Sequence, residues 1–125
     1  MKVGNKIPSF KLPDQDWNDI ESEELLGEPF VIYFYPKDDT PGCTKQACAF
    51  RDHFSDFEER GVKVIGVSAD SPEDHRLFKE KYNLPFRLLS DPDKKLHKKF
   101  GVGKHLLGLL PGRVTYIFDA EGTLV

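Results

Sequence analysis

Long hydrophobic runs are missing from this sequence. No apolar stretch approaches the ~20 residues that a helix needs to cross a bilayer. Residues 1–10 also hold no apolar stretch of signal-peptide length. We therefore expect a cytoplasmic protein with no membrane partner.

An excess of charge of one sign is missing as well. The chain has 18 Lys and Arg against 21 Asp and Glu, for a net charge of -3, and the two signs are interspersed. A protein that binds nucleic acid usually displays a basic patch. This charge balance therefore predicts no nucleic-acid partner.

Cysteine is scarce, with two residues in a chain of 125. Cytosolic thiols are kept reduced, so this pair is not expected to form a disulfide scaffold, and a catalytic or redox role fits better. The four histidines are His53, His75, His97 and His105. They show no ligand-like spacing with each other or with the cysteines, so we expect them at the surface.

What the sequence does contain is material for one hydrophobic core. Hydrophobic residues make up 38% of the chain, and ten residues are Phe. This amount fits one domain over residues 1–125.

Strand and helix patterns alternate along the chain. Residues 30–34 (FVIYF) form an unbroken β-branched and aromatic run, which predicts a buried strand. Apolar residues then recur at intervals of three and four from Cys43 to Phe57, which predicts one helix up to Gly61. Further strands are expected at 62–68, 86–89 and 114–118, and further helices at 72–82, after Ser71 as N-cap, and at 91–101, after Asp91 as cap. This order indicates an α/β sheet layered with helices.

The two ends of the chain give weaker patterns. Residues 1–20 contain Pro8 and Pro13, and they suggest short edge strands or a hairpin over the sheet. Residues 123–125 look like the start of one more strand after a turn at 120–122.

One loop delivers a cysteine to the start of a helix. Residues 35–43 (YPKDDTPGC) connect the first buried strand with the first long helix. Unpaired backbone N–H groups and the positive end of the helix dipole favour a thiolate at Cys43, which is the nucleophilic form. Thr40 is close enough for its hydroxyl to bond the thiolate or an incoming oxygen, and Pro36 can wall the pocket because it has no N–H.

These residues match a known motif. The spacing Pro36-x-x-x-Thr40-x-x-Cys43 resembles the active-site motif of the peroxiredoxins. Residues 33–45 (YFYPKDDTPGCTK) look like the bacterioferritin-comigratory-protein branch, also called the Q type, and residues 111–119 (PGRVTYIFD) are similar to the family's strand with the active-site arginine. The resemblance covers essentially the whole chain. It implies a thioredoxin-like fold, a sheet with flanking helices.

The resemblance also implies an activity and its residues. Hydrogen peroxide or organic hydroperoxides would be reduced through a sulfenic acid on Cys43, without a metal or an organic cofactor. Thr40 would be the hydrogen-bonding partner, Pro36 the shield and Arg113 the cation that holds the thiolate and polarises the peroxide. Attack on the O–O bond spreads negative charge over the departing oxygen. The donors of Arg113, Thr40 and the N–H groups of Gly42 and Cys43 are therefore expected to stabilise the transition state.

Cys48 is the resolving cysteine that the Q-type resemblance implies. On a continuous helix its Cα would lie roughly 8.7 Å from that of Cys43, whereas a disulfide tolerates at most about 7 Å. The first turns of the helix would have to unwind before the bond could form. The alternative interpretation of Cys48 is a small core residue on the helix face.

The sequence departs from the family pattern at two points, and the resemblance implies a reductant and an oligomeric state. Many family members have Glu where this chain has Gln46, and the family usually continues past Val125 with a strand and a long helix that this sequence lacks. The reductant would be thioredoxin or a similar dithiol, and the Q type suggests a monomer.

Two other functions fit the same fold. A thiol-disulfide reductase normally uses a Cys-x-x-Cys pair, and here four residues separate the cysteines, which argues against it. A non-catalytic thioredoxin-like domain that binds a partner is the other alternative.

Overall fold

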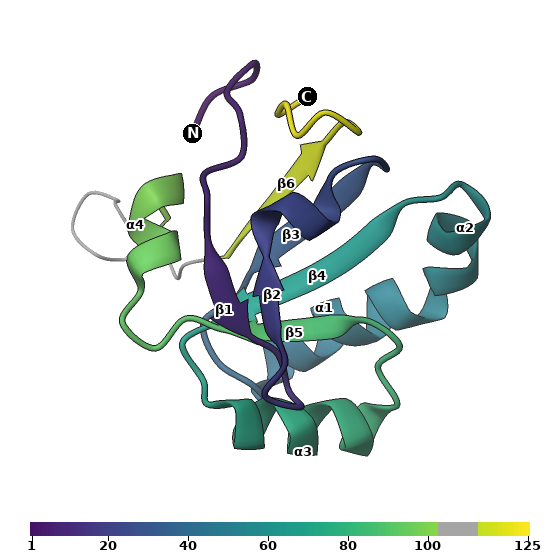
Figure 1. Ribbon diagram of the computed structural model, residues 1–125. Helices are drawn as coiled ribbons and strands as arrows, with labels where there is room; N and C mark the ends of the chain where they lie inside the picture. The colour runs from purple at the N-terminus through teal and green to yellow at the C-terminus, as the bar shows by residue number, and fades with distance from the viewer. Residues whose placement is uncertain (103–112) are drawn as a thin grey trace.

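The computed structural model describes residues 1–102 and 113–125. Its centre is a four-stranded sheet in the order β5-β4-β3-β6 (Figure 1). The strands are β3 (Phe30–Phe34), β4 (Lys63–Ser68), β5 (Arg87–Ser90) and β6 (Val114–Phe118). β3, β4 and β5 are parallel, whereas β6 runs antiparallel to β3. The expected α/β sheet is confirmed. The sequence does not predict that β6 runs antiparallel to the other three strands.

Helices and a small hairpin cover this sheet. The helices are α1 (Pro41–Asp52), α2 (Phe54–Glu59), α3 (Pro72–Tyr82) and α4 (Lys95–Phe100), with a 3-10 turn η1 (Ser22–Leu25). β1 (Lys11–Pro13) and β2 (Asp19–Glu21) pair as an N-terminal hairpin, which is one of the two arrangements that the sequence suggests. Among the described residues no helix is long and apolar enough to span a membrane.

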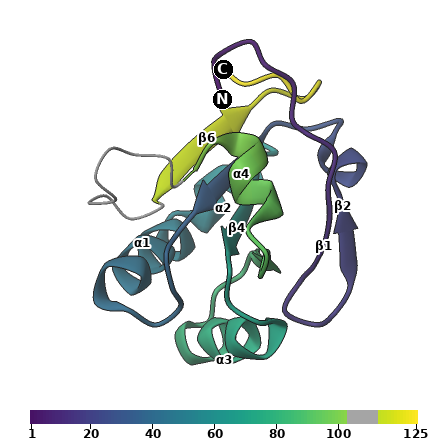
Figure 2. The ribbon, with the colours of Figure 1, turned by 90° about the vertical axis from the view of Figure 1, so that its left-hand side faces the viewer.

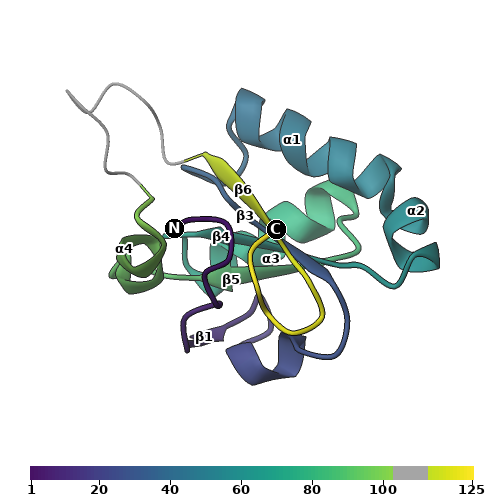
Figure 3. The same ribbon diagram turned by 90° about the horizontal axis from the view of Figure 1, so that it is seen from above.

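The core has two halves, one on each face of the sheet. Side chains alternate along β3, so Tyr33 and Tyr35 pack on the face covered by α1 and α3. Phe30, Ile32 and Phe34 pack on the opposite face, where α4, η1 and the β1–β2 hairpin lie (Figures 2 and 3). The fully buried run of β3 thus serves both halves, which explains its unbroken apolar sequence.

The helix after the cysteine loop differs from the sequence expectation. A single helix up to Gly61 is wrong, because α1 ends at Asp52 and α2 begins at Phe54. His53 adopts φ -105 and ψ 10 between them, and its N–H still bonds the carbonyl of Ala49. The apolar spacing continues across this break, so the periodicity could not reveal it.

The two capped helices agree more closely with the sequence. The Ser71 side chain accepts a hydrogen bond from the Asp74 N–H, and α3 follows from Pro72 to Tyr82 as expected. α4 starts at Lys95 rather than directly after Asp91. The Asp91 carboxylate nevertheless accepts the backbone N–H of His97 at 2.9 Å, because a turn at 92–94 carries the helix start back over it.

The two ends of the described chain lie side by side (Figure 1). The Gly4 N–H donates to the Leu124 carbonyl at 2.8 Å, and Lys6 pairs with Thr123 in an isolated antiparallel β-bridge. Leu124 forms another antiparallel β-bridge with Phe118 in β6, and it is 6% exposed. Residues 123–125 therefore begin to extend the edge of β6, in line with the expected strand start.

Candidate active site

Cys43 lies in the first turn of α1. The loop from β3 leads to Thr40, which has the extended backbone of an N-cap, and Pro41 then occupies the first helical position. The first hydrogen bond inside the helix runs from the Thr44 N–H to the Thr40 carbonyl. The N–H groups of Gly42 and Cys43 precede this bond, so they remain available as donors at the positive end of the helix.

Arg113 reaches Cys43 from the start of β6, the strand next to β3. The antiparallel register pairs Phe34 with Val114, so Arg113 lies beside the point where β3 enters the cysteine loop. Its Nη2 donates to Cys43 Sγ at 3.2 Å, while Nη1 donates to the Gly42 carbonyl at 3.1 Å. Guanidinium donates but never accepts, and it stays charged, so this contact stabilises negative charge on the sulfur.

Gln46 holds the arginine in place. Its Oε1 accepts a hydrogen bond from Arg113 Nη1 at 3.1 Å, one helical turn after Cys43. The amide therefore supplies an acceptor at the position where the resemblance implies a carboxylate. The guanidinium is fixed by three acceptors, of which only Cys43 can react with a peroxide.

Thr40 and Pro36 belong to the loop before Cys43, and the Thr40 hydroxyl does not hydrogen-bond the Cys43 sulfur. The Thr40 hydroxyl donates to the Lys37 carbonyl at 2.9 Å, which leaves its oxygen lone pairs free to accept. The hydroxyl would have to rotate to donate to the thiolate or to a peroxide oxygen. Pro36 is exposed, and its function as a shield stays a prediction.

Both cysteines lie on an intact α1. Cys43 is 2% exposed, Cys48 is half-buried, and both are free thiols. Since α1 is continuous from Pro41 to Asp52, the expected Cα separation of roughly 8.7 Å holds for this state. A bond between them requires α1 to open.

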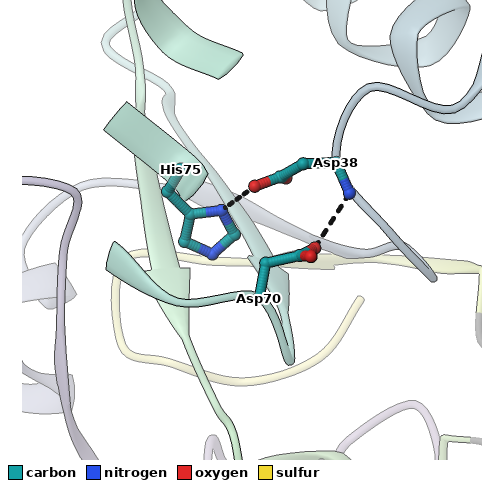
Figure 4. A group of neighbouring side chains, drawn as sticks. All are labelled: Asp38, Asp70 and His75. Carbon is teal, nitrogen blue, oxygen red and sulfur yellow. Dashed lines mark hydrogen bonds and ion pairs between the residues drawn. The ribbon is translucent and has the colours of Figure 1, made fainter. Parts of the chain in front are cut away.

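A buried histidine lies beneath the same loop, which corrects the expectation of surface histidines. His75 is completely buried, and its Nδ1 lies 2.6 Å from Asp38 Oδ2 (Figure 4). The sequence held a signal for this position, because His75, Phe78 and Tyr82 recur at intervals of three and four on one face of α3. Asp38 itself lies among the exposed-looking charges of the loop, so its burial gave no local signal.

His97 corrects the same expectation on the other face of the sheet. It is 6% exposed, and its Nδ1 lies 2.6 Å from Asp91 Oδ2. Burial opposes ionisation of Asp91, but hydrogen bonds from the His97 ring and backbone outweigh it and hold the pKa of this carboxyl below its usual 3.8. His53 is exposed as expected, and His105 lies outside the described residues.

The group of Asp38, Asp70 and His75 offers ligand atoms within 4.8 Å of one another, a spacing that a metal ion could also use. The carboxylate oxygens are already engaged, however. Asp70 Oδ2 accepts from the Asp38 N–H at 2.8 Å and from the Ser68 hydroxyl at 2.7 Å. The donors match a hydrogen-bond network better than a cation site.

The sequence and the fold both match known proteins. The family model described as "AhpC/TSA family" matches residues 3–125. A chloroplastic peroxiredoxin Q from Gentiana triflora is 50% identical over 121 residues, which cover 97% of this chain and 56% of that protein. The chain thus spans about half the length of the curated relatives that it matches.

Solved structures agree with the sequence relatives. The peroxidoxin BcpB of Mycobacterium tuberculosis has a TM-score of 0.89 and 37% identity, with 99% of this chain and 82% of that chain covered. The bacterioferritin comigratory protein of Xanthomonas campestris, solved in work on its alkyl peroxide reduction activity, has a TM-score of 0.85 and 35% identity, with 93% and 77% covered. These matches confirm the thioredoxin-like fold and the resemblance read from the motif. The chain therefore belongs to the AhpC/TSA family, in its peroxiredoxin Q branch.

Proposed function

We propose that this protein is a thiol-dependent peroxidase that reduces hydrogen peroxide and organic hydroperoxides. One observation carries the proposal: Arg113 Nη2 contacts Cys43 Sγ at 3.2 Å in the first turn of α1. A cation and two free backbone N–H groups at a nucleophilic sulfur are suited to charge that develops on an adjacent oxygen.

The proposed reaction has three steps. The Cys43 thiolate attacks the nearer peroxide oxygen, the O–O bond breaks, and the second oxygen leaves as water or an alcohol after it takes up a proton. Cys43 is then a sulfenic acid, and the peroxide has been reduced by two electrons. The Cys48 thiolate next attacks the Cys43 sulfur, which forms a disulfide, and the sulfenic oxygen leaves as water after it takes up a proton. A dithiol such as thioredoxin finally reduces this disulfide by exchange and becomes oxidised itself.

An apolar groove supports the larger substrate class. It has a volume of about 330 Å³ and is lined by Gln46, Ala49, Phe50, His53 and Phe57 along α1 and α2. The groove begins at Gln46, which also holds Arg113. The hydrocarbon part of an organic hydroperoxide could lie there while its peroxide group faces Cys43. The alkyl peroxide activity described for the related Xanthomonas protein is consistent with this substrate class.

The remaining expectations belong to the proposal. A thioredoxin-like reductant fits because the cycle ends in a disulfide between two cysteines of one chain. A reducing compartment, the cytoplasm, fits two free thiols. A monomer fits because the proposed chemistry needs no residue from a second copy.

The test is peroxide consumption in the presence of thioredoxin, thioredoxin reductase and NADPH. Steady turnover that depends on both the protein and the peroxide supports a peroxidase. Reduction of a model disulfide without peroxide turnover would instead indicate a thiol-disulfide reductase. Neither activity would indicate a non-catalytic binding domain. Hydrogen peroxide and cumene hydroperoxide compared in the same assay measure the contribution of the apolar groove.

A further inference from the structure

A buried hydrogen-bond network lies directly under the loop that carries Thr40. It joins the loop after β3 to helix α3, as Figure 4 shows, and it also reaches the end of β5. The Tyr35 hydroxyl donates to Asp38 Oδ1 at 2.6 Å, and His75 Nδ1 lies 2.6 Å from the other oxygen of the same carboxyl. None of these three side chains forms a hydrogen bond with Cys43, and the proposed reaction steps do not use them.

The donors and acceptors of this network can be counted. His75 Nε2 lies 3.0 Å from the Leu89 carbonyl, which can only accept, so Nε2 carries a hydrogen. One further proton lies between Nδ1 and Asp38 Oδ2. Burial, followed by the charge of Asp38, raises the pKa of Tyr35 well above its ordinary value, so that hydroxyl stays a donor. Every polar atom that faces the Asp38 carboxyl is therefore matched, and removal of one partner leaves a buried polar group unpaired.

Hydrogen bonds also fix the backbone of the loop after β3. The Asp38 N–H donates to Asp70 Oδ2 at 2.8 Å. The next residue, Asp39, has a left-handed φ of 56, and its carboxylate accepts from Lys81 Nζ at 2.8 Å and from the Tyr82 hydroxyl at 2.7 Å. Side chains of helix α3 thus hydrogen-bond two successive loop residues, the buried Asp38 and the exposed Asp39. Thr40, the N-cap of α1, follows at once.

This arrangement matters because the active site changes shape during the proposed cycle. α1 has to open before Cys48 can reach Cys43, while Thr40 and Arg113 have to meet the next peroxide in the same geometry. A fixed loop confines the unwinding to α1. It also returns the N-terminus of α1 to the same position when the helix forms again. Misplacement of reacting groups by about 1 Å can cost on the order of 100-fold in rate.

We infer that His75 is a positioning residue for peroxide reduction: through Asp38 it holds the loop at 36–40, and thereby sets Thr40 and the first turn of α1 against Arg113. The inference rests on the proposed function. It assigns His75 no contact with the substrate.

Two variants of His75 separate this function from simple core packing. In His75→Asn the amide nitrogen takes the covalent position of Nδ1, so the hydrogen bond to Asp38 can be kept while the one to Leu89 is lost. In His75→Gln the amide nitrogen takes the position of Nε2, so the Leu89 bond can be kept and the Asp38 bond is lost. Leu77→Ala is the matched control, because Leu77 lies on the same helix and is 66% exposed.

The measurement is the second-order rate constant for oxidation of Cys43, from rapid mixing with hydrogen peroxide and mass spectrometry of the quenched thiol. We expect His75→Gln to be slower than wild type by about 10- to 100-fold. His75→Asn and Leu77→Ala are expected to stay within about threefold of wild type, well under one tenfold step in rate. A wild-type rate in His75→Gln overturns the inference. So does an equal loss of rate in His75→Asn and His75→Gln, because only packing would then matter.

A second measurement does not depend on peroxide chemistry. Amide exchange at Asp38 and Asp39 should be faster in His75→Gln than in His75→Asn, since the loop loses its buried anchor. Equal exchange in the two variants overturns the inference. If wild type fails to react with peroxide, the proposed function is wrong, and this exchange comparison still decides whether His75 holds the loop.

If His75→Gln does not fold, Tyr35→Phe removes the other donor to Asp38 and is expected to shift rate and exchange in the same direction. A wild-type rate and wild-type exchange in Tyr35→Phe then overturn the inference.

Discussion

Arg113 Nη2 and Cys43 Sγ lie 3.2 Å apart although 70 positions separate the two residues in the sequence. The antiparallel pairing of β3 with β6 brings them together, because Phe34 faces Val114 at the end where the cysteine loop begins. The nucleophile and its cation thus come from segments far apart in the chain, and the contact exists only in the folded sheet. Each of the following predictions tests one part of this arrangement.

Cys43→Ser is expected to abolish peroxide reduction. A serine hydroxyl is a far poorer nucleophile at neutral pH, and Arg113, the side chain that hydrogen-bonds this position among the described residues, cannot remove its proton. The coupled NADPH assay measures the loss, and circular dichroism shows whether the fold is kept. Turnover near the wild-type rate in this variant would refute Cys43 as the nucleophile.

Arg113→Ala is expected to slow Cys43 oxidation by about 10²- to 10³-fold, the usual effect of removing one fixed donor at a developing charge. Arg113 is exposed, so the fold should tolerate the change. Arg113→Lys is the matched control: it keeps the charge but offers one nitrogen in place of the two that contact Sγ, Gly42 and Gln46, and we expect an intermediate rate. If Arg113→Ala oxidises as fast as wild type, the contact with the sulfur has no catalytic importance.

Gln46→Leu tests the residue that orients the arginine. It removes one acceptor of the guanidinium, and a lost hydrogen bond to a charged group of about 1.5 kcal/mol corresponds to roughly a tenfold slower oxidation. Gln46→Glu keeps an acceptor at this position and should oxidise at least as fast as wild type. The idea fails if Leu and Glu at position 46 give the same second-order rate constant.

Local signals explain which parts of the fold could be predicted from the sequence. Ser71 and Pro72 mark the start of α3, and the apolar run of β3 marks a central strand, because caps and strand composition act within a few residues. The direction of β6 depends on pairing with the distant strand β3, and the break at His53 falls within an apolar spacing that continues across it. No short stretch of sequence carries that information.

The same distinction applies to the site. Pro36, Thr40 and Cys43 could be found because they lie within one loop and form a motif. Arg113 was found only by resemblance, and its exposed position on an edge strand would have suggested a surface charge. The partner of His75 could not be predicted, because Asp38 lies 37 positions away and looks like any other loop carboxylate.

The Asp91–His97 pair predicts a pH dependence of stability. The folded pKa of Asp91 is lowered, so its ionised form stabilises the fold above the ordinary carboxyl value of 3.8, and this contribution is lost as the pH falls through the lower folded value. Asp91→Asn keeps an acceptor but removes the charge. We expect it to lower the free energy of unfolding by about 1–2 kcal/mol at neutral pH. Urea denaturation should show this difference shrinking below about pH 4. A difference that stays constant down to pH 2 would contradict the prediction.

The last prediction concerns Cys48, for which helix geometry requires a conformational change that the sequence motif does not indicate. Since α1 is intact from Pro41 to Asp52, the reduced protein cannot form a bond between Cys43 and Cys48. If Cys48 resolves the sulfenic acid, the oxidised protein should have α1 unwound at least through Cys48. Amide exchange of residues 44–48 should therefore become faster on oxidation. The cost should be modest, because the first turn already contains N–H groups without helical partners.

Mass spectrometry after one equivalent of peroxide decides between the two interpretations of Cys48. Wild type is expected to contain an intramolecular disulfide between Cys43 and Cys48. In Cys48→Ser the first equivalent should still be consumed, but the sulfenic acid should persist and overoxidise unless an external thiol reacts with it. Cys48→Ser keeps a side chain of similar size, so helix packing is the same in both proteins. A wild-type product with only a sulfenic acid, or only a disulfide between two chains, would make Cys48 a core residue of α1, because its sulfur would then never reach Cys43.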